Sequence, residues 1–110
     1  KFGPSAYVIT VTDAGKAHVV SVLVDWTDDR LVFGAGRTTL ANSAARPDVA
    51  LLWAPIEPGG YSLIVDGTAT RDDPGLDRLA VRPSKAILHR SAEPSATGAQ
   101  VSDCVPVLKT

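Results

Sequence analysis

Apolar and polar residues alternate along the first third of the chain in short segments that turn residues separate. The segment 6–11 (AYVITV) is rich in β-branched residues, and 13–16 (DAGK) follows it with turn chemistry, so the two predict a strand and a hairpin. The segment 18–26 (HVVSVLVDW) continues as a strand, and a third short strand is expected at 31–33. One face of segment 18–26 carries Val20, Val22 and Val24, and the other carries Val19, Ser21, Leu23 and Asp25. Because both faces are mostly apolar, we expect this strand to be central.

The pattern changes at 34–47 (GAGRTTLANSAARP), where two glycines end the third strand and small residues follow. Alanine favours a helix, and Pro47 discourages the residue before it from staying helical, so we predict a short helix over 39–46. Four of its residues are spaced so that they face a sheet or a barrel end: Leu40 and Ala44, and Ala41 and Ala45.

Two further strands are predicted at 48–53 (DVALLW) and 61–70 (YSLIVDGTAT), with a proline- and glycine-rich loop between them. Gly67 lies inside the second of these strands, where glycine often marks a bulge or bend that lets a sheet curl into a barrel. This half of the chain therefore continues the antiparallel pattern.

The C-terminal part is less regular. Residues 71–75 (RDDPG) break the chain, and 76–82 fit a short strand or one helical turn. The segment 85–90 (KAILHR) predicts a sixth strand, 91–100 predicts a polar surface loop, and 104–108 shows apolar alternation. About six antiparallel strands with one short helix after the third predict a small, mostly β (α+β) barrel that forms one domain over residues 1–110.

Composition narrows the function classes. The 110 residues contain 11 Lys and Arg against 12 Asp and Glu, a formal charge of −1, which argues against a nucleic-acid partner. No apolar run approaches the roughly 18 residues that a membrane span needs, and no signal peptide is found at Lys1, so we expect no membrane partner. The single cysteine, Cys104, excludes an internal disulfide and fits a reducing compartment. We expect a cytoplasmic protein in which Cys104 is a small buried hydrophobe.

The stretch around Arg37 has the chemistry of an anion site. Glycine lets the backbone approach a ligand closely, and the first turn of a helix presents unpaired N–H groups and partial positive charge. The Arg37 guanidinium can bind a phosphate in a bidentate manner, while the hydroxyls of Thr38 and Thr39 can bind an anion or cap the helix. A plain loop with an N-cap fits the same residues, and both interpretations stay open.

Other combinations of reactive residues do not form recognisable sites. His18, His89 and Cys104 lack metal-ligand spacing, so no metal site is predicted. No nucleophile-elbow sequence surrounds any serine, which argues against hydrolysis. Trp26 and Trp53 are expected in the core or at an interface.

The order of these segments resembles the pyridoxamine 5′-phosphate oxidase-like family of flavin-binding split β-barrels, and in particular its small actinobacterial members. The resemblance covers nearly the whole chain: AGKAHVVSV at 14–22, DDRLVF at 28–33, GRTT at 36–39, LANSAARPDVALLW at 40–53, YSLIVDGTA at 61–69 and VRPSKAILHR at 81–90. It implies a split barrel that dimerises and binds flavin mononucleotide (FMN) in clefts at the subunit interface.

The resemblance also implies which residues bind the cofactor. Three would hold the phosphate, three would border the isoalloxazine ring, two would line the same edge and one would lie near the ring or the ribityl chain: Arg37, Thr38 and Thr39; Val20, Ser21 and Val22; Ala35 and Gly36; and Ser62. Thr39 stands where the family often has a lysine, so a deazaflavin is the alternative cofactor.

Two function classes follow. The first is an FMN-binding oxidoreductase, a homodimer that transfers a hydride or electrons to or from a small-molecule substrate; no catalytic residue can be assigned. The second is a non-catalytic module that binds flavin, haem or another tetrapyrrole. A barrel of the oligonucleotide-binding type ranks last, because the charge is near neutral and aromatic residues make up only 5% of the chain.

Overall fold

The computed structural model describes residues 2–73, 75–94 and 100–108, with the backbone alone for residues 91–94, 100–106 and 108. Seven strands and one helix follow each other along the chain: β1 (Ser5–Val11), β2 (Ala17–Thr27), β3 (Arg30–Gly34), α1 (Arg37–Ala45), β4 (Asp48–Trp53), β5 (Tyr61–Arg71), β6 (Arg78–Pro94) and β7 (Gln100–Leu108). Strands predicted from alternation therefore form at β1 to β5, with ends that differ by one residue or none. In the described part of the chain no helix is both long and apolar enough to cross a membrane.

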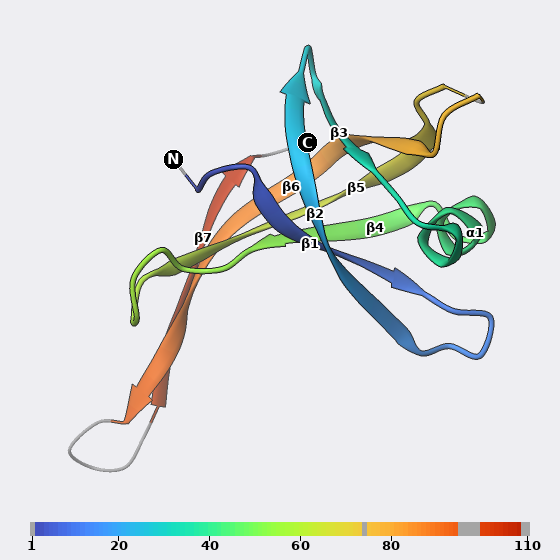
Figure 1. Ribbon diagram of the computed structural model, residues 1–110. Coiled ribbons are helices and arrows are strands. Elements are labelled where there is room, and N and C mark those ends of the chain that lie inside the picture. The colour runs from blue at the N-terminus through green and yellow to red at the C-terminus, as the bar shows by residue number, and fades with distance from the viewer. Residues whose placement is uncertain (1, 74, 95–99, 109–110) are drawn as a thin grey trace.

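The strands form one antiparallel sheet in the order β3-β2-β1-β4-β5-β6-β7, and a further pairing between β3 and β6 closes the first six into a barrel (Figure 1). The first part of β6 makes this closure, from Gly34 opposite Arg78 to Leu31 opposite Val81. The second part of β6 leaves β3 and pairs with β7 instead. The prediction of a small, mostly β barrel with one helix after the third strand is confirmed, and the barrel is split where β6 changes partner.

The prediction for the C-terminal part of the chain was wrong about where its strands begin and end. The segments 76–82 and 85–90 were expected to be separate, and 91–100 was expected to be a loop, but one strand runs from Arg78 to Pro94 and β7 begins at Gln100. Pro83 does not interrupt the strand because it lies opposite Gly67, where the β5–β6 pairing shifts register. A bulge tolerates proline, and the predicted bulge at Gly67 is confirmed.

The barrel interior takes one face of each strand. Val24 is buried in it, and Val20 and Val22 pack against it, so the predicted division of β2 into two faces is confirmed. Trp53 belongs to this core, and its Nε1 donates a hydrogen bond of 3.0 Å to the Gly3 carbonyl. Trp26, by contrast, lies outside the core, with 65% of its surface exposed.

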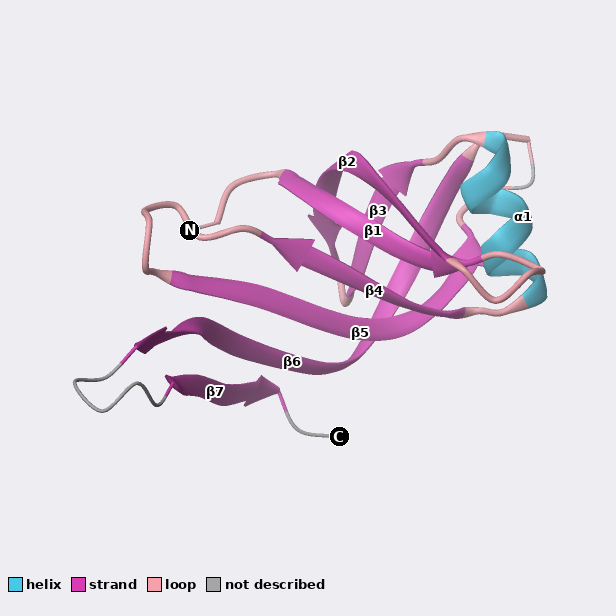
Figure 2. Cartoon of the chain, turned by 90° about the horizontal axis from the view of Figure 1, so that it is seen from below, coloured by secondary structure: helices cyan, strands magenta, loops and turns pink. Residues whose placement is uncertain are grey.

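Helix α1 lies across one end of the barrel, and the outer part of the β6–β7 pair extends from the opposite side (Figure 2). It begins at Arg37, two residues before the predicted start, and ends at Ala45, one residue before the predicted end. The prediction rested on the alanines and Pro47, and it left open whether the threonine hydroxyls cap the helix or bind an anion. The N-cap is instead Gly36, which makes no side-chain cap, so neither Thr38 nor Thr39 caps the helix.

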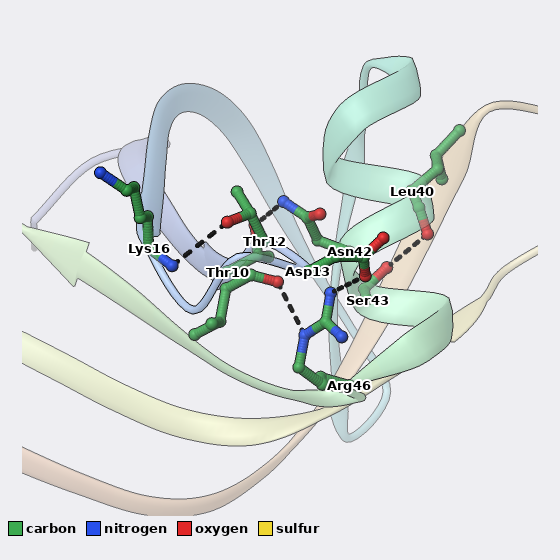
Figure 3. Close-up of polar contacts among 9 residues, drawn as sticks. Thr10, Thr12, Asp13, Lys16, Leu40, Asn42, Ser43 and Arg46 are labelled. Carbon is green, nitrogen blue, oxygen red and sulfur yellow. Dashed lines mark hydrogen bonds and ion pairs between the residues drawn. The ribbon is translucent and has the colours of Figure 1, made fainter.

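The buried face of α1 is polar, which contradicts the predicted apolar face. Thr39, Asn42 and Ser43 are buried, whereas the three alanines expected to pack inward, Ala41, Ala44 and Ala45, are exposed and only Leu40 packs against the core. The reason is the buried hydroxyl of Thr10 on β1, which accepts a hydrogen bond of 3.1 Å from Asn42 Nδ2 (Figure 3). Burying a polar group requires such a partner, so the helix turns its amide side chain inward.

The C-terminal end of α1 is tied to the β1–β2 hairpin. Arg46 Nε donates to the Val11 carbonyl at 2.8 Å, and Arg46 Nη2 forms an ion pair with Asp13 at 2.9 Å (Figure 3). Both contacts join segments more than 30 residues apart in sequence and fix the direction of the helix across the barrel end.

Candidate functional site

A pocket of about 370 Å³ lies between the first half of β2 and the start of α1. Its volume falls at the lower end of the range typical of small-molecule sites. The pocket brings together residues that are far apart in sequence and includes most of those expected from the resemblance: His18, Val20, Ser21, Val22, Gly34, Gly36, Arg37, Thr38 and Thr39.

One wall of the pocket is an open strand edge. Strand β3 pairs only with residues Val24–Thr27 of β2, so the β2 backbone before Val24 has no strand beside it on that side. The Val24 N–H donates to the Pro4 carbonyl at 2.8 Å, which shows that alternate residues counted from Val24 direct their backbone groups toward β1. The residues between them, Val19 and Ser21, therefore direct N–H and C=O toward the open edge. Ser21 therefore lines the pocket at this open edge, although its side chain lies on the exposed face of β2.

The opposite wall is the start of α1. The first intrahelical bond runs from the Leu40 N–H to the Gly36 carbonyl at 3.0 Å, so the N–H groups of Arg37, Thr38 and Thr39 have no partner within the helix. The loop before the helix is anchored to the segment that precedes β6, because the Ala35 N–H donates to the Asp77 carbonyl at 2.9 Å. The helix start is thus a fixed donor set with partial positive charge.

The three residues expected to hold a phosphate have different environments. Arg37 and Thr38 are exposed, and Arg37 forms no ion pair with any carboxylate in the described part of the chain. Thr39 is only 1% exposed, so its side chain packs into the protein below the pocket. Of these three side chains, those of Arg37 and Thr38 are therefore accessible to a ligand in the pocket, whereas Thr39 has only its backbone N–H to offer.

Two of the expected site residues do not line this pocket. Ala35, between Gly34 and Gly36, is buried, with 8% of its surface exposed. Ser62 lies at the start of β5, opposite His89, and its hydroxyl donates to the His89 carbonyl at 3.2 Å. Within one chain, Ser62 and the pocket at Arg37 are separate features.

His18 lines the pocket although it was not among the predicted cofactor-binding residues. It lies on the inward face of β2 opposite Thr10, and its Nδ1 is buried without a hydrogen-bond partner. A lone histidine without metal-ligand spacing carries no sequence signal; only the pairing of β2 with β1 places it beside the helix.

The pocket has the character of an anion-binding site with an apolar wall. None of its described lining residues is acidic, and Val20 and Val22 supply apolar surface next to Arg37. Among the described residues no group of three or more His, Cys, Asp or Glu side chains could hold a metal ion. The side chain of Cys104 lies outside the described residues, so its expected burial stays a prediction.

Known proteins resemble this chain in sequence and in structure. No protein-family model matches it. The uncharacterized proteins Mb0449c of Mycobacterium bovis and MT0457 of Mycobacterium tuberculosis are each 44% identical to it over 119 aligned positions, which cover 93% of this chain and 84% of each relative.

Three solved structures share the fold. An F420 reductase superposes with a TM-score of 0.63 at 21% identity, over 76% of this chain and 90% of that protein. A pyridoxamine 5′-phosphate oxidase-related, FMN-binding protein of Nostoc punctiforme gives a TM-score of 0.66 at 9% identity, over 93% and 86%. A haem-binding protein of Mycobacterium smegmatis gives 0.65 at 12% identity, over 94% of this chain but 53% of that protein.

At such identities these structures establish the fold alone, whereas the two mycobacterial relatives establish kinship. The chain belongs to the family of the mycobacterial proteins Mb0449c and MT0457, and its fold is the split barrel of the pyridoxamine 5′-phosphate oxidase-like proteins.

Proposed function

We propose that the protein is an FMN-binding oxidoreductase that acts on a small molecule, with a deazaflavin as the alternative cofactor. The observation that carries the proposal is the pairing, in one pocket, of an open strand edge with the N-terminus of α1 and Arg37. Fold neighbours described as an F420 reductase and as an FMN-binding protein support a flavin-type ligand.

The residues of the pocket fit both ends of such a ligand. The backbone N–H and C=O groups of Val19 and Ser21 offer donors and acceptors in a row, as the pyrimidine edge of a flavin ring requires. Arg37, the Thr38 hydroxyl and the helix N–H groups suit a phosphate. A bound flavin supplies the hydride or electron transfer, so this chain has to bind, orient and shield it rather than provide an acid and a base.

We further propose a homodimer. The outer face of the barrel carries exposed apolar side chains on neighbouring strands, Tyr7 and Val11 on β1 and Val19 and Leu23 on β2. Strand pairing extends this face across the sheet, from Tyr7 to Leu52, Ile64 and Ile87. This apolar face, exposed on β1 and β2 and half-buried at Leu52, Ile64 and Ile87, is the surface that we expect a second copy to cover.

A second copy on this face would bury well over about 1,000 Å² in total, the size of a stable interface. Ser62 does not line the pocket of its own chain, so on this proposal it would reach the cofactor only from the second subunit. A single cysteine in the sequence fits a reducing compartment, and we place the protein in the cytoplasm.

Arg37→Ala tests the proposal. Loss of a charged hydrogen-bonding partner of the phosphate should weaken FMN binding by about 1.5 to 3 kcal/mol, roughly ten- to a hundredfold, in a fluorescence titration. Arg82→Ala is the matched control, since Arg82 is exposed on β6 and lines no part of this pocket. Equal FMN affinity in the two variants would contradict a phosphate site at Arg37.

A non-catalytic binding module is the second candidate. The similarity to a haem-binding protein favours it, as does a pocket whose described lining has no acidic side chain. Multiple turnovers of an electron acceptor with bound flavin and a nicotinamide donor would exclude a purely non-catalytic role. A Soret band that shifts when haem is added, without any flavin binding, would support the module.

A further inference from the structure

One side chain of the pocket, His18, has a buried polar atom that no group in the described part of the chain satisfies. His18 Nδ1 is buried and has no hydrogen-bond partner, although most buried polar atoms in proteins have one. The Thr10 hydroxyl opposite it accepts a hydrogen bond from Asn42 Nδ2 and forms none with His18.

The two ring nitrogens of His18 differ in access. Nδ1 is shut off from solvent, so Nε2 is the ring nitrogen that remains for a hydrogen bond to a ligand in the pocket that His18 lines. If the proton lies on Nε2, the buried Nδ1 holds a lone pair rather than an unpaired N–H donor, and Nε2–H becomes a donor toward the pocket. His18 would then offer the same kind of contact as Arg37 and the N–H groups at the start of α1.

Those groups all suit a negatively charged ligand. The helix N–H groups and the Arg37 guanidinium are donors only, and none of the described lining residues is acidic. We propose that His18 is a phosphate-binding residue of this pocket, which donates from Nε2 to the phosphate that Arg37 and the start of α1 also bind. The inference rests on the proposed cofactor site and adds to it a contact from β2, across the pocket from the helix.

Nuclear magnetic resonance on ¹⁵N-histidine-labelled protein tests the contact without a flavin. The chain has two histidines, and His89→Gln assigns their signals. Inorganic phosphate at millimolar concentration, against sodium chloride at matched ionic strength and pH, should shift the His18 ring signals in a saturable way and leave those of His89 unchanged. Arg37→Ala should remove the response. A His18 signal that does not move, or that moves equally in Arg37→Ala, overturns the inference.

Flavin binding gives a second readout. His18→Phe should weaken FMN binding about tenfold while leaving riboflavin, which lacks the phosphate, unaffected, and His18→Gln, which keeps a donor, should retain part of the FMN affinity. His89→Gln is the matched control, because His89 does not line the pocket. Circular dichroism verifies that each variant is folded.

The two ideas fail in different ways. If the parent protein binds neither flavin but phosphate still shifts His18 through Arg37, the proposed cofactor is wrong and the phosphate contact stands. If the parent binds both flavins and His18→Phe weakens both equally, the cofactor site stands and the phosphate role of His18 is wrong.

Discussion

Gly67 should be the most sensitive glycine of the barrel. A Cβ placed there would lie 2.6 Å from the Arg82 carbonyl oxygen, 2.6 Å from Val81 Cγ1 and 3.1 Å from the Arg82 carbonyl carbon. Carbon atoms do not approach so closely, so Gly67→Ala requires β5 or β6 to move. Neither strand can move freely, because Thr68 pairs with Arg82 beside the bulge and Val81 belongs to the core.

The cost follows from overpacking. An extra methyl group in a packed core costs about 1 to 3 kcal/mol, and we expect the upper half of this range because two of the three contacts are backbone atoms. For a chain of this length each kcal/mol lowers the melting temperature by about 4 °C, so Gly67→Ala should melt about 8 to 12 °C below the parent.

Gly34→Ala is the matched control. Its added Cβ would meet only the Asp77 carbonyl oxygen, at 3.9 Å, which is an ordinary contact. Thermal unfolding followed by circular dichroism at one protein concentration compares the two variants, since binding between copies would make the melting temperature depend on concentration. Melting temperatures within about 2 °C of each other, or about 0.5 kcal/mol, would refute the steric argument.

Four other substitutions test three separate parts of the structure. Leu23→Lys places a charge on the exposed apolar face and should convert the proposed dimer into a monomer in sedimentation velocity; an unchanged sedimentation coefficient would contradict that interface. Thr39→Ala should lower the free energy of unfolding by about 1 to 2 kcal/mol with little change in FMN affinity, because Thr39 is buried. Thr38→Ala should instead weaken FMN binding with little change in stability, because Thr38 is exposed. The opposite pattern would reverse their assigned roles. Asn42→Ala removes the partner of the buried Thr10 hydroxyl and should cost about 1 to 3 kcal/mol in urea unfolding, and a smaller loss would show that water replaces the amide.

The sequence predicts much of the barrel because its signals are local. Alternation along 6–11, 48–53 and 61–70 depends only on which side of a strand faces the core, and those strands form as expected. The continuity of β6 could not be predicted in the same way. Proline normally ends a strand, and Pro83 is tolerated here because the β5–β6 pairing shifts register at Gly67, where β6 carries the extra residue Ser84.

In the candidate site too, the features that depend on local sequence were predictable and those that depend on long-range pairing were not. The glycines, Arg37 and the threonines are contiguous in sequence, so a helix N-terminus with anion-binding chemistry was predictable, although the cap was not. The closeness of His18 to this helix depends on strand pairing over long range, and a lone histidine carries no pattern of its own. The buried polar face of α1 likewise depends on one hydroxyl, that of Thr10, on another strand.

The closure of the barrel between β3 and β6 has a consequence for the way the chain folds. The β1–β2 and β2–β3 hairpins join residues that are near neighbours in sequence, but Leu31 must find Val81 across nearly half of the chain. Contacts of such high sequence separation carry a large loop-closure entropy and slow folding toward the millisecond-to-second range. The hairpins can therefore form first, and the β3–β6 pairing, which is the seam of the barrel, can form last. Until that seam closes, β3 and the first part of β6 are unpaired edges, and during this interval the chain is most exposed to strand pairing with other copies of itself.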